Sequence, residues 1–147
     1  MTKTADRLDP IVCFRFEVAF VGLDGGGGFS DCTGLQLETT LQDYNEGGLN
    51  SHAWKFPTRS AFSNIVLKRG IVDRQLFQWY YDLTRGRVVR RDGTITVLDP
   101  DGGTPLMVWR FEKAFPCKWI GPELHAKQSE LIVETIELCH LGFARQT

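Results

Sequence analysis

A strict alternation of apolar and polar side chains over residues 12–20 is the clearest pattern in the chain. Apolar side chains occupy every second position there, namely Phe14, Phe16, Val18 and Phe20. Because successive strand residues point to opposite faces, the pattern predicts a strand with one buried face. A second alternation over residues 35–42, in which Leu35, Leu37 and Leu41 are separated by polar residues, predicts another strand with a polar outer face.

The period changes to that of a helix over residues 72–85. Apolar residues such as Leu76 and Trp79 fall on one side of a 3.6-residue wheel, and charged residues fall on the other side. Asp73 is suited to cap the start of this helix, and Gly86 is suited to end it in the left-handed conformation. This is the one helix that the pattern predicts.

The remaining apolar stretches predict more strands. Residues 64–69 read as a strand, and residues 94–98 and 106–113 flank the turn sequence DPDGG, which predicts a hairpin. Residues 115–120 extend this hairpin past a bend at Pro116. Residues 129–141 are apolar on both faces, and their β-branched content favours a strand over a buried helix. The fold class is therefore mainly β, with two packed antiparallel sheets forming a β-sandwich or barrel and one α-helix.

Residues 44–62 show no period. They contain the Gly47–Gly48 pair and Pro57, yet they also hold Trp54 and Phe56. These features predict a long loop that carries aromatic side chains. Since long loops without secondary structure of their own tend to be functional, we expect a contact surface here.

The length of 147 residues predicts a single domain spanning residues 1–147. Residues 1–9 and 142–147 have little apolar content and are expected to form an N-terminal and a C-terminal arm. The net charge of −1 excludes bulk attraction to nucleic acid or to an anionic membrane. The first ten residues lack the apolar run of a secretory signal, and no stretch is long enough to span a bilayer, so we expect synthesis in the cytoplasm.

No grouping of residues predicts a catalytic, cofactor or metal site. The four cysteines form no CxxC pair and are expected to be buried, reduced thiols. The three histidines lack the spacing of a zinc site. Cys139 and His140 are adjacent, but neighbouring strand residues point to opposite faces and cannot form a dyad. We therefore expect no enzymatic activity and no cofactor.

One concentration of charge stands out after the predicted helix. Four guanidinium groups within seven residues could hold phosphates or the carboxylates of a protein partner, or could form a solvated surface loop; the residues are Arg85, Arg87, Arg90 and Arg91. A nucleic-acid-binding β-barrel that uses this cluster is an alternative reading of the chain.

Several stretches, taken in order, resemble the tail tube proteins of contractile phages and of extracellular contractile injection particles. They are GFSDCTGL at residues 28–35, YNEGG at 44–48, LKRG at 67–70, the tryptophan-bearing helix, and WRFEKAFP at 109–116. The resemblance covers residues 10–143. It implies two packed sheets with one helix, closed six-fold into rings that stack into a hollow tube.

The resemblance also implies where subunits meet. Residues 44–62 correspond to the extended loop through which members of this family contact neighbouring subunits and rings. The interface candidates are Tyr44, Glu46, Gly47, Gly48, His52, Trp54, Phe56 and Pro57.

The implied function is mechanical. The chain would be the inner-tube subunit of a contractile tail or injection particle, driven through a target envelope by a contracting sheath, with DNA or protein cargo in the lumen. The implied partners are further copies in homohexameric rings, a sheath protein, and baseplate and cap proteins, and no membrane span is expected. Assembly would occur in the cytoplasm, in a phage virion or a particle that is later released. A tube initiator at the baseplate and the secreted tube of a type VI system are alternatives of the same fold.

Overall fold

The computed structural model describes residues 15–24, 28–44, 47, 54–101, 103–127 and 132–146, which form nine strands and one helix. The mainly β prediction with one helix is confirmed. The elements are β1 (Arg15–Phe20), β2 (Asp31–Thr33), β3 (Leu37–Tyr44), β4 (Trp54–Phe62), β5 (Ile65–Gly70), α1 (Arg74–Thr84), β6 (Arg91–Leu98), β7 (Pro105–Ile120), β8 (Glu134–Cys139) and β9 (Gly142–Arg145).

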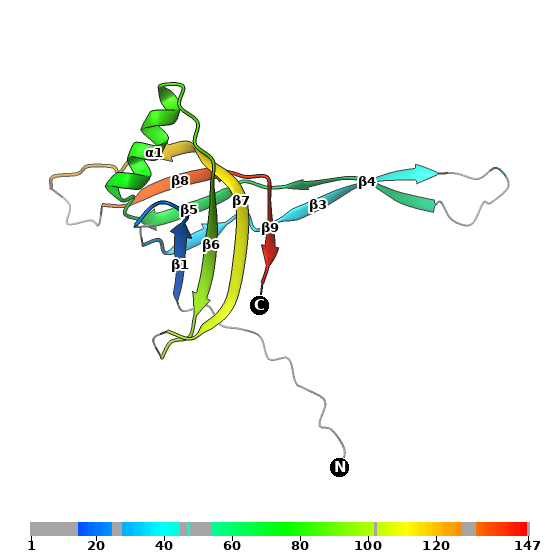
Figure 1. The fold of residues 1–147 in the computed structure, drawn as a ribbon, viewed down its shortest axis with the longest axis horizontal. Coiled ribbons are helices and arrows are strands. Elements are labelled where there is room, and N and C mark those ends of the chain that lie inside the picture. The colour runs from blue at the N-terminus through cyan, green and yellow to red at the C-terminus, as the bar shows by residue number, and fades with distance from the viewer. Residues whose placement is uncertain are drawn as a thin grey trace, which may run out of the picture.

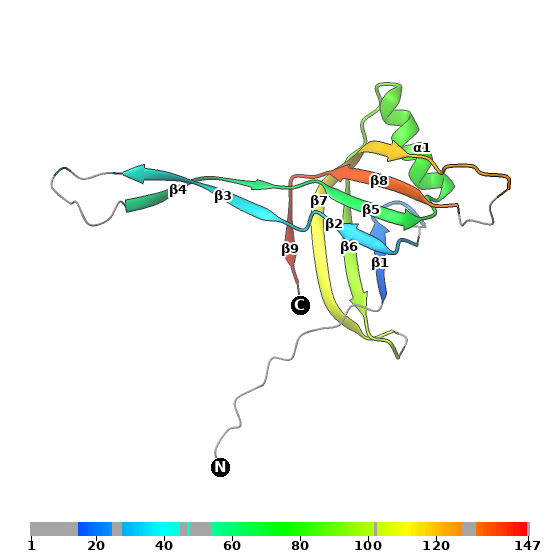
Figure 2. The ribbon, with the colours of Figure 1, turned by 180° about the vertical axis from the view of Figure 1, so that it is seen from behind.

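Seven of the strands form one curled antiparallel sheet in the order β1-β6-β7-β8-β5-β2, with β9 also paired to β7. The 16-residue strand β7 belongs to both halves of this sheet, because it pairs with β6 and β9 in its first part and with β8 in its last part. We call β1, β6, the first part of β7 and β9 the first half-sheet, and the last part of β7, β8, β5 and β2 the second half-sheet. The second half-sheet runs across the first, as Figures 1 and 2 show from opposite sides. The two packed layers that the sequence predicts are thus joined through a single strand.

A β-bulge lies where β7 leaves the first half-sheet. The register shifts between Arg91 and Gly93, and Lys113 on the opposite strand has a φ of 49°, a left-handed conformation. The Asp92 carboxylate accepts a hydrogen bond from the Lys113 backbone N–H at 3.0 Å and pairs with the Arg110 guanidinium at 3.4 Å. Since a bulge bends and twists its strand, this contact stabilises the curl that brings the two half-sheets together.

The core lies between the two half-sheets. Strand β1 contributes Val18 and Phe20, as the alternation over residues 12–20 predicts, although residues 12–14 lie outside the described part of the chain. The other half-sheet contributes fully buried side chains such as Leu67 and Ile136. The Phe111 ring, also fully buried, packs edge-on against Phe20 with ring centroids 5.8 Å apart.

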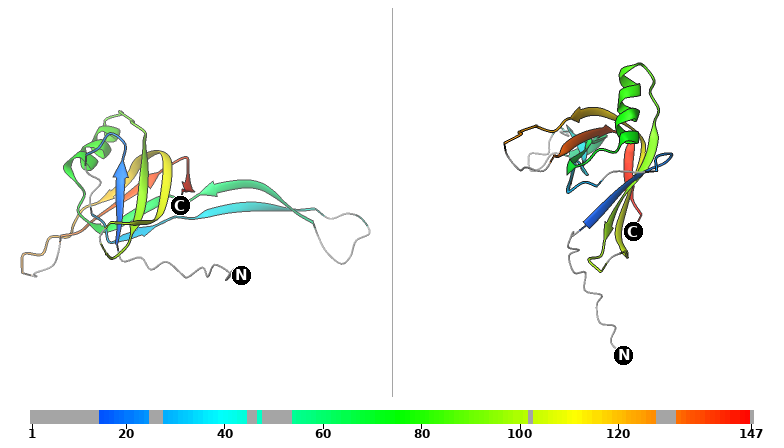
Figure 3. Two further views of the ribbon diagram at one scale, coloured as in Figure 1. Left: turned by 60° about the horizontal axis from the view of Figure 1, so that its bottom comes forward. Right: turned by 90° about the vertical axis from the view of Figure 1, so that its left-hand side faces the viewer.

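Helix α1 covers one end of this core and confirms the helix prediction. The Asp73 side chain caps the helix by accepting a hydrogen bond from the Arg74 backbone N–H, and Gly86 follows the helix at a φ of +89°. Leu76 and Trp79 are buried, and the Trp79 indole donates to the Val89 carbonyl at 2.6 Å. The view in Figure 3 (right) shows the helix standing above the junction of the half-sheets.

Three regions differ from the sequence-based expectations. Residues 142–145 form β9 against β7, so the prediction of a C-terminal arm is wrong for these residues. The strand is short, and backbone hydrogen bonds to β7 hold it in place. The three-residue strand β2 pairs with β5 and is too short for an alternation to be visible. The expected loop over residues 44–62 contains β4, which is described below.

The carboxylate of Asp92 predicts a pH dependence of stability. The hydrogen bond from the Lys113 backbone and the nearby Arg110 hold the pKa of Asp92 below its usual value. A carboxyl group with a lowered folded-state pKa stabilises the fold above its unfolded-state pKa of about 3.9, and this contribution is lost as the pH falls. We expect Asp92→Asn to lower the melting temperature at pH 7, with a difference from wild type that narrows below about pH 4.

The matched control is Asp101→Asn in the exposed turn between β6 and β7. Melting curves measured by circular dichroism between pH 2 and pH 8 would contradict the role of Asp92 if its variant followed the control across the whole range.

Candidate functional site

The projecting ribbon of β3 and β4 is the main candidate site. The two strands pair along their whole length from Leu37 with Phe62 to Tyr44 with Trp54, and every residue of both strands is exposed. The ribbon extends far from the curled sheet in Figures 1 and 2. A single hairpin is at best marginally stable in water, because it has no second layer to cover either face. The ribbon therefore needs a covering surface, and the part of the chain that the structure describes does not supply one.

The register divides the ribbon into two faces. Directly paired residues lie on the same face, so Leu41 and Pro57 share one face while Gln42 and Phe56 share the other. A bulge at Thr58, where the register shifts between Thr40 and Leu41, separates the inner and outer parts of the ribbon. Both faces mix apolar and polar pairs. The first face ends in the charged pair of Asp43 with Lys55, whereas the second bears an aromatic group at its outer end.

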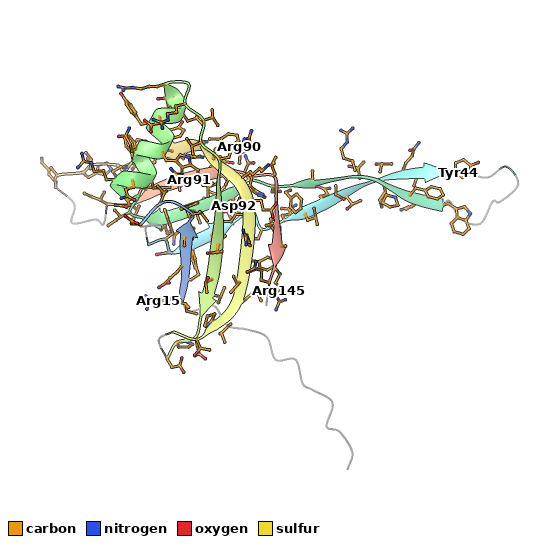
Figure 4. The ribbon with its side chains drawn as sticks, in the orientation of Figure 1. Arg15, Tyr44, Arg90, Arg91, Asp92 and Arg145 are labelled. Atoms are coloured by element: carbon orange, nitrogen blue, oxygen red, sulfur yellow. The ribbon has the colours of Figure 1, made fainter. Side chains whose placement is uncertain are left out.

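This aromatic group consists of Tyr44, Trp54 and Phe56, which we call the aromatic cluster. Their exposed fractions are 55%, 51% and 50%, respectively. The Tyr44 and Phe56 rings meet edge to face with centroids 6.0 Å apart, and Figure 4 shows Tyr44 at the outer end of the ribbon. Clusters of half-exposed aromatic side chains are typical of the buried centres of protein interfaces.

The base of the ribbon is anchored to the body by aromatic packing. The Phe62 ring lies edge to face against Phe143 of β9, with centroids 5.0 Å apart, and 5.9 Å from His140. The His140 Nε2 donates to the Ser63 carbonyl at 2.8 Å. The ribbon is thus held at its inner end and exposed at its outer end, and His140 has a structural role at the joint.

The prediction that residues 44–62 form a loop is wrong for residues 54–62. The side chains of these residues point to alternate faces of the ribbon, but each face mixes apolar and polar side chains, so the sequence shows no period. The structure brings Tyr44, Trp54 and Phe56 together and places Pro57 on the opposite face, while Gly47 lies exposed beyond β3. Glu46, Gly48 and His52 lie outside the described residues. The role of these residues as interface candidates stays a prediction.

The outer face of the first half-sheet is a second candidate surface that sequence reasoning missed. The register places Arg15, Glu17, Thr94, Thr96, Arg110, Glu112 and Ala144 on this face, together with Asp92. Its charges are largely compensated, because Arg15 pairs with Glu17 at 3.1 Å and Arg110 pairs with Asp92 at 3.4 Å. This outer face is polar and nearly neutral. The alternation of polar residues could have predicted its polarity, but not which strands lie side by side on it.

The structure divides the predicted basic cluster among different contacts. The Arg85 guanidinium stacks on the Tyr81 ring at 4.7 Å from its centroid, and that of Arg90 stacks on Phe115 at 4.8 Å. Arg91 lies 5.6 Å from the Trp79 ring centroid, and together with Arg87 it lines a cavity beside α1. Two of the four arginines thus share a site, and the other two are held on aromatic rings.

The described residues hold few groups suited to chemistry. They contain no cluster of three or more His, Cys, Asp or Glu residues that could bind a metal ion. Cys117 is exposed and Cys32 and Cys139 are only half-buried, so the expectation of buried thiols is wrong for these three residues, and Cys13 lies outside the described residues. Partial desolvation raises the pKa of the Cys117 thiol, and the nearby Glu137 carboxylate adds to this effect. A thiol with a raised pKa is a poor nucleophile at neutral pH. Among these residues, no helix is long and apolar enough to cross a bilayer.

Similar structures come from contractile injection systems. A chain in the cryo-EM structure of the PVC sheath–tube complex, an extracellular contractile injection system in the extended state, aligns with a TM-score of 0.79 at 28% identity, covering 93% of this chain and 91% of that chain. For a chain in the structure of the PVC sheath/tube terminator, the TM-score is 0.80 at 27% identity, and the alignment covers 95% of this chain and 99% of that chain. For a chain in the structure of the anti-feeding prophage tube terminating cap, the TM-score is 0.80 at 26% identity, and the alignment covers 100% of this chain and 99% of that chain. Comparison with curated protein sequences gives no match.

The curled sheet with a projecting ribbon is therefore the fold of tail-tube components. The chain belongs to the T4-like virus tail tube protein gp19 family, whose profile matches residues 12–144. The resemblance that the sequence motifs carry is confirmed.

The position of the aromatic cluster predicts that a substitution there affects assembly but not the stability of the single chain. Because Trp54 lies on an exposed ribbon outside the core, Trp54→Ala should change the free energy of unfolding of the single chain by no more than about 0.5 kcal/mol. If the aromatic cluster forms a subunit interface, as predicted, the same substitution should prevent sedimentation of assembled particles. Denaturant unfolding followed by circular dichroism measures the first effect, and ultracentrifugation measures the second.

The matched control is Trp109→Ala, which removes a tryptophan that packs against the core and should destabilise the chain itself. Assembly of the Trp54 variant at wild-type levels would show that the aromatic cluster is not an interface.

Proposed function

We propose that this chain is a structural subunit of the inner tube of a contractile tail or injection particle. Copies form six-fold rings, the rings stack into a hollow tube, and a contracting sheath drives the tube through a target envelope. The membership of the tail tube family supports this reading, as does the likeness to a chain of a sheath–tube complex. The observation that carries the proposal is the ribbon of β3 and β4, whose two faces are exposed along their whole length.

The order of the first half-sheet supports closure into a ring. Its two outermost strands are β1 and β9, and neighbouring strands are antiparallel throughout. Strands β1 and β9 therefore run in opposite directions, so β9 of one copy can lie antiparallel to β1 of the next. Repeating this head-to-tail contact around an axis closes a barrel and removes the unpaired edges.

In such a barrel the outer face of the first half-sheet lines the channel. Its charged side chains include two arginines, Arg15 and Arg110, and three acids, Glu17, Asp92 and Glu112, and the exposed Lys113 at the bulge adds a positive charge beside Asp92. This balance gives a channel wall without a strong charge of either sign. The wall suits the passage or holding of cargo, DNA or protein, because it offers little electrostatic retention to either.

The ribbon completes the assembly by covering neighbouring copies. Its aromatic cluster at the outer end lies far from the body of its own chain, where a second subunit or the next ring supplies the missing layer (Figure 1). The chain acts without making or breaking bonds. Its partners are further copies of itself, a sheath protein, and baseplate and cap proteins, and it is made in the cytoplasm before it enters a phage tail or a released particle.

A tube terminator is a second candidate for the same chain. The TM-scores to chains in the PVC terminator and anti-feeding prophage cap structures are 0.80, against 0.79 for the sheath–tube complex. A terminator would form one ring at a tube end, whereas a tube subunit adds rings without limit.

Electron microscopy of the purified chain tests the proposal. We expect six-fold rings that grow into tubes as the protein concentration rises, because the edge and ribbon contacts recur on every copy. Single rings that never elongate would favour the terminator. A chain that stays monomeric at every concentration and salt tested would contradict both readings.

A further inference from the structure

An open cavity of about 540 Å³ lies between α1 and the segment that leads into β6. It is lined by three arginines from separate parts of the chain, Arg74 in the first turn of α1, Arg87 after the helix, and Arg91 at the start of β6. Figure 4 shows Arg91 at the helix end of the body. We call this site the arginine pocket.

Arg91 is fixed in the arginine pocket by its surroundings. Its guanidinium donates to the Val21 carbonyl at 3.1 Å and lies over the Trp79 ring. Gly22 has a φ of +86°, and a Cβ atom there would lie only 2.3 Å from a guanidinium nitrogen of Arg91. Only a glycine at position 22 leaves enough room for the Arg91 side chain. The Nε atom of Arg91 is buried and finds no hydrogen-bond partner among the described residues.

The arginine pocket has an excess of positive charge. Asp82 is the one acidic residue in its lining, and the Asp82 carboxylate already accepts a hydrogen bond from the Gln78 amide at 2.9 Å. No ion pair within the described part of the chain involves Arg74, Arg87 or Arg91. Guanidinium groups in such a setting bind carboxylates well, because they offer paired donors and are weakly hydrated.

A matching acidic feature lies at the opposite end of the same strand. Strand β6 starts at Arg91 and ends at Leu98, and the turn that follows carries Asp99 and Asp101. The turn is held by a hydrogen bond from the Asp99 N–H to the Thr104 carbonyl at 3.0 Å, and Asp101 is exposed. Eight strand residues span about 26 Å, so the turn cannot reach the arginine pocket of its own chain. Figures 1 and 3 show the turn and the helix at opposite ends of the first half-sheet.

We propose that the acidic turn of one copy docks in the arginine pocket of a second copy of this chain in the adjacent ring. This inference rests on the proposed tube function and specifies the polar contact between rings. The occupant is a second copy because the two complementary features lie on one chain at opposite ends of one strand. Displacing a copy along β6 therefore places the turn of one copy over the pocket of the next, a heterologous contact that repeats along the tube.

Charge reversal tests this contact. Arg87→Asp and Asp101→Arg should each raise the protein concentration needed for tube growth more than about tenfold, because a charged partner is lost and like charges meet. Rings should still form in both variants, since neither residue lies on the edge strands or the ribbon. The double variant with both reversals should restore tube growth. Quantitative electron microscopy and sedimentation provide the readout, and growth of wild-type tubes should weaken as salt rises.

Two control variants carry matched charge changes. Arg85→Asp alters a guanidinium two residues away that is bound to Tyr81 and does not line the pocket, and Glu123→Arg alters an exposed acid outside the turn. Both should grow tubes as wild type does. The inference is overturned if the single reversals also grow like wild type, which would leave the pocket to a different partner, or if the double variant grows no better than the singles. A wild-type chain that forms no tubes would instead refute the proposed function.

Discussion

A two-stranded ribbon cannot bury its side chains between layers of its own, and this constraint underlies the assembly that we propose. In β3 and β4 the backbone groups between the strands are paired, but each face lacks a second layer. Burial of apolar side chains drives the folding of β-structures, and only the inner end of this ribbon obtains it, where Phe62 packs against Phe143. The outer end, with Tyr44, Trp54 and Phe56, has no such cover among the described residues, and we propose that another molecule supplies it. The single chain is in this sense an incomplete structure.

The body of the molecule is complete, and it presents the surfaces that assembly requires. The bulge at Lys113, held by Asp92, turns one long strand into the link between two layers. One consequence is the buried core between the two half-sheets. The other is a first half-sheet whose outer face carries no helix of the described residues and whose outermost strands, β1 and β9, run in opposite directions. The curl of a single sheet thus forms the core, and in the proposed tube it also forms the channel wall and the ring contact.

Sequence reasoning succeeded where one face of an element is buried. Alternation in β1 and the 3.6-residue period of α1 are visible because the core imposes them on residues such as Val18 and Leu76. It failed for β4, because the faces of this strand mix apolar and polar side chains and a bulge at Thr58 interrupts its period, although the equally exposed β3 does show an alternation. The ordered motifs still identified the family, while the contact region that they imply stays a prediction. The arginine pocket could not be predicted, because Arg74 and Arg91 are brought together only by the packing of α1 on the sheet.

Amide hydrogen exchange on the ribbon tests the central claim most directly. If neighbouring copies supply the missing layer, the amides of β3 and β4 exchange rapidly in the unassembled chain and slowly in the assembled tube, while core strands such as β6 are protected in both. Equal protection of β3 and β4 before and after assembly would contradict the claim that the ribbon is completed by other subunits.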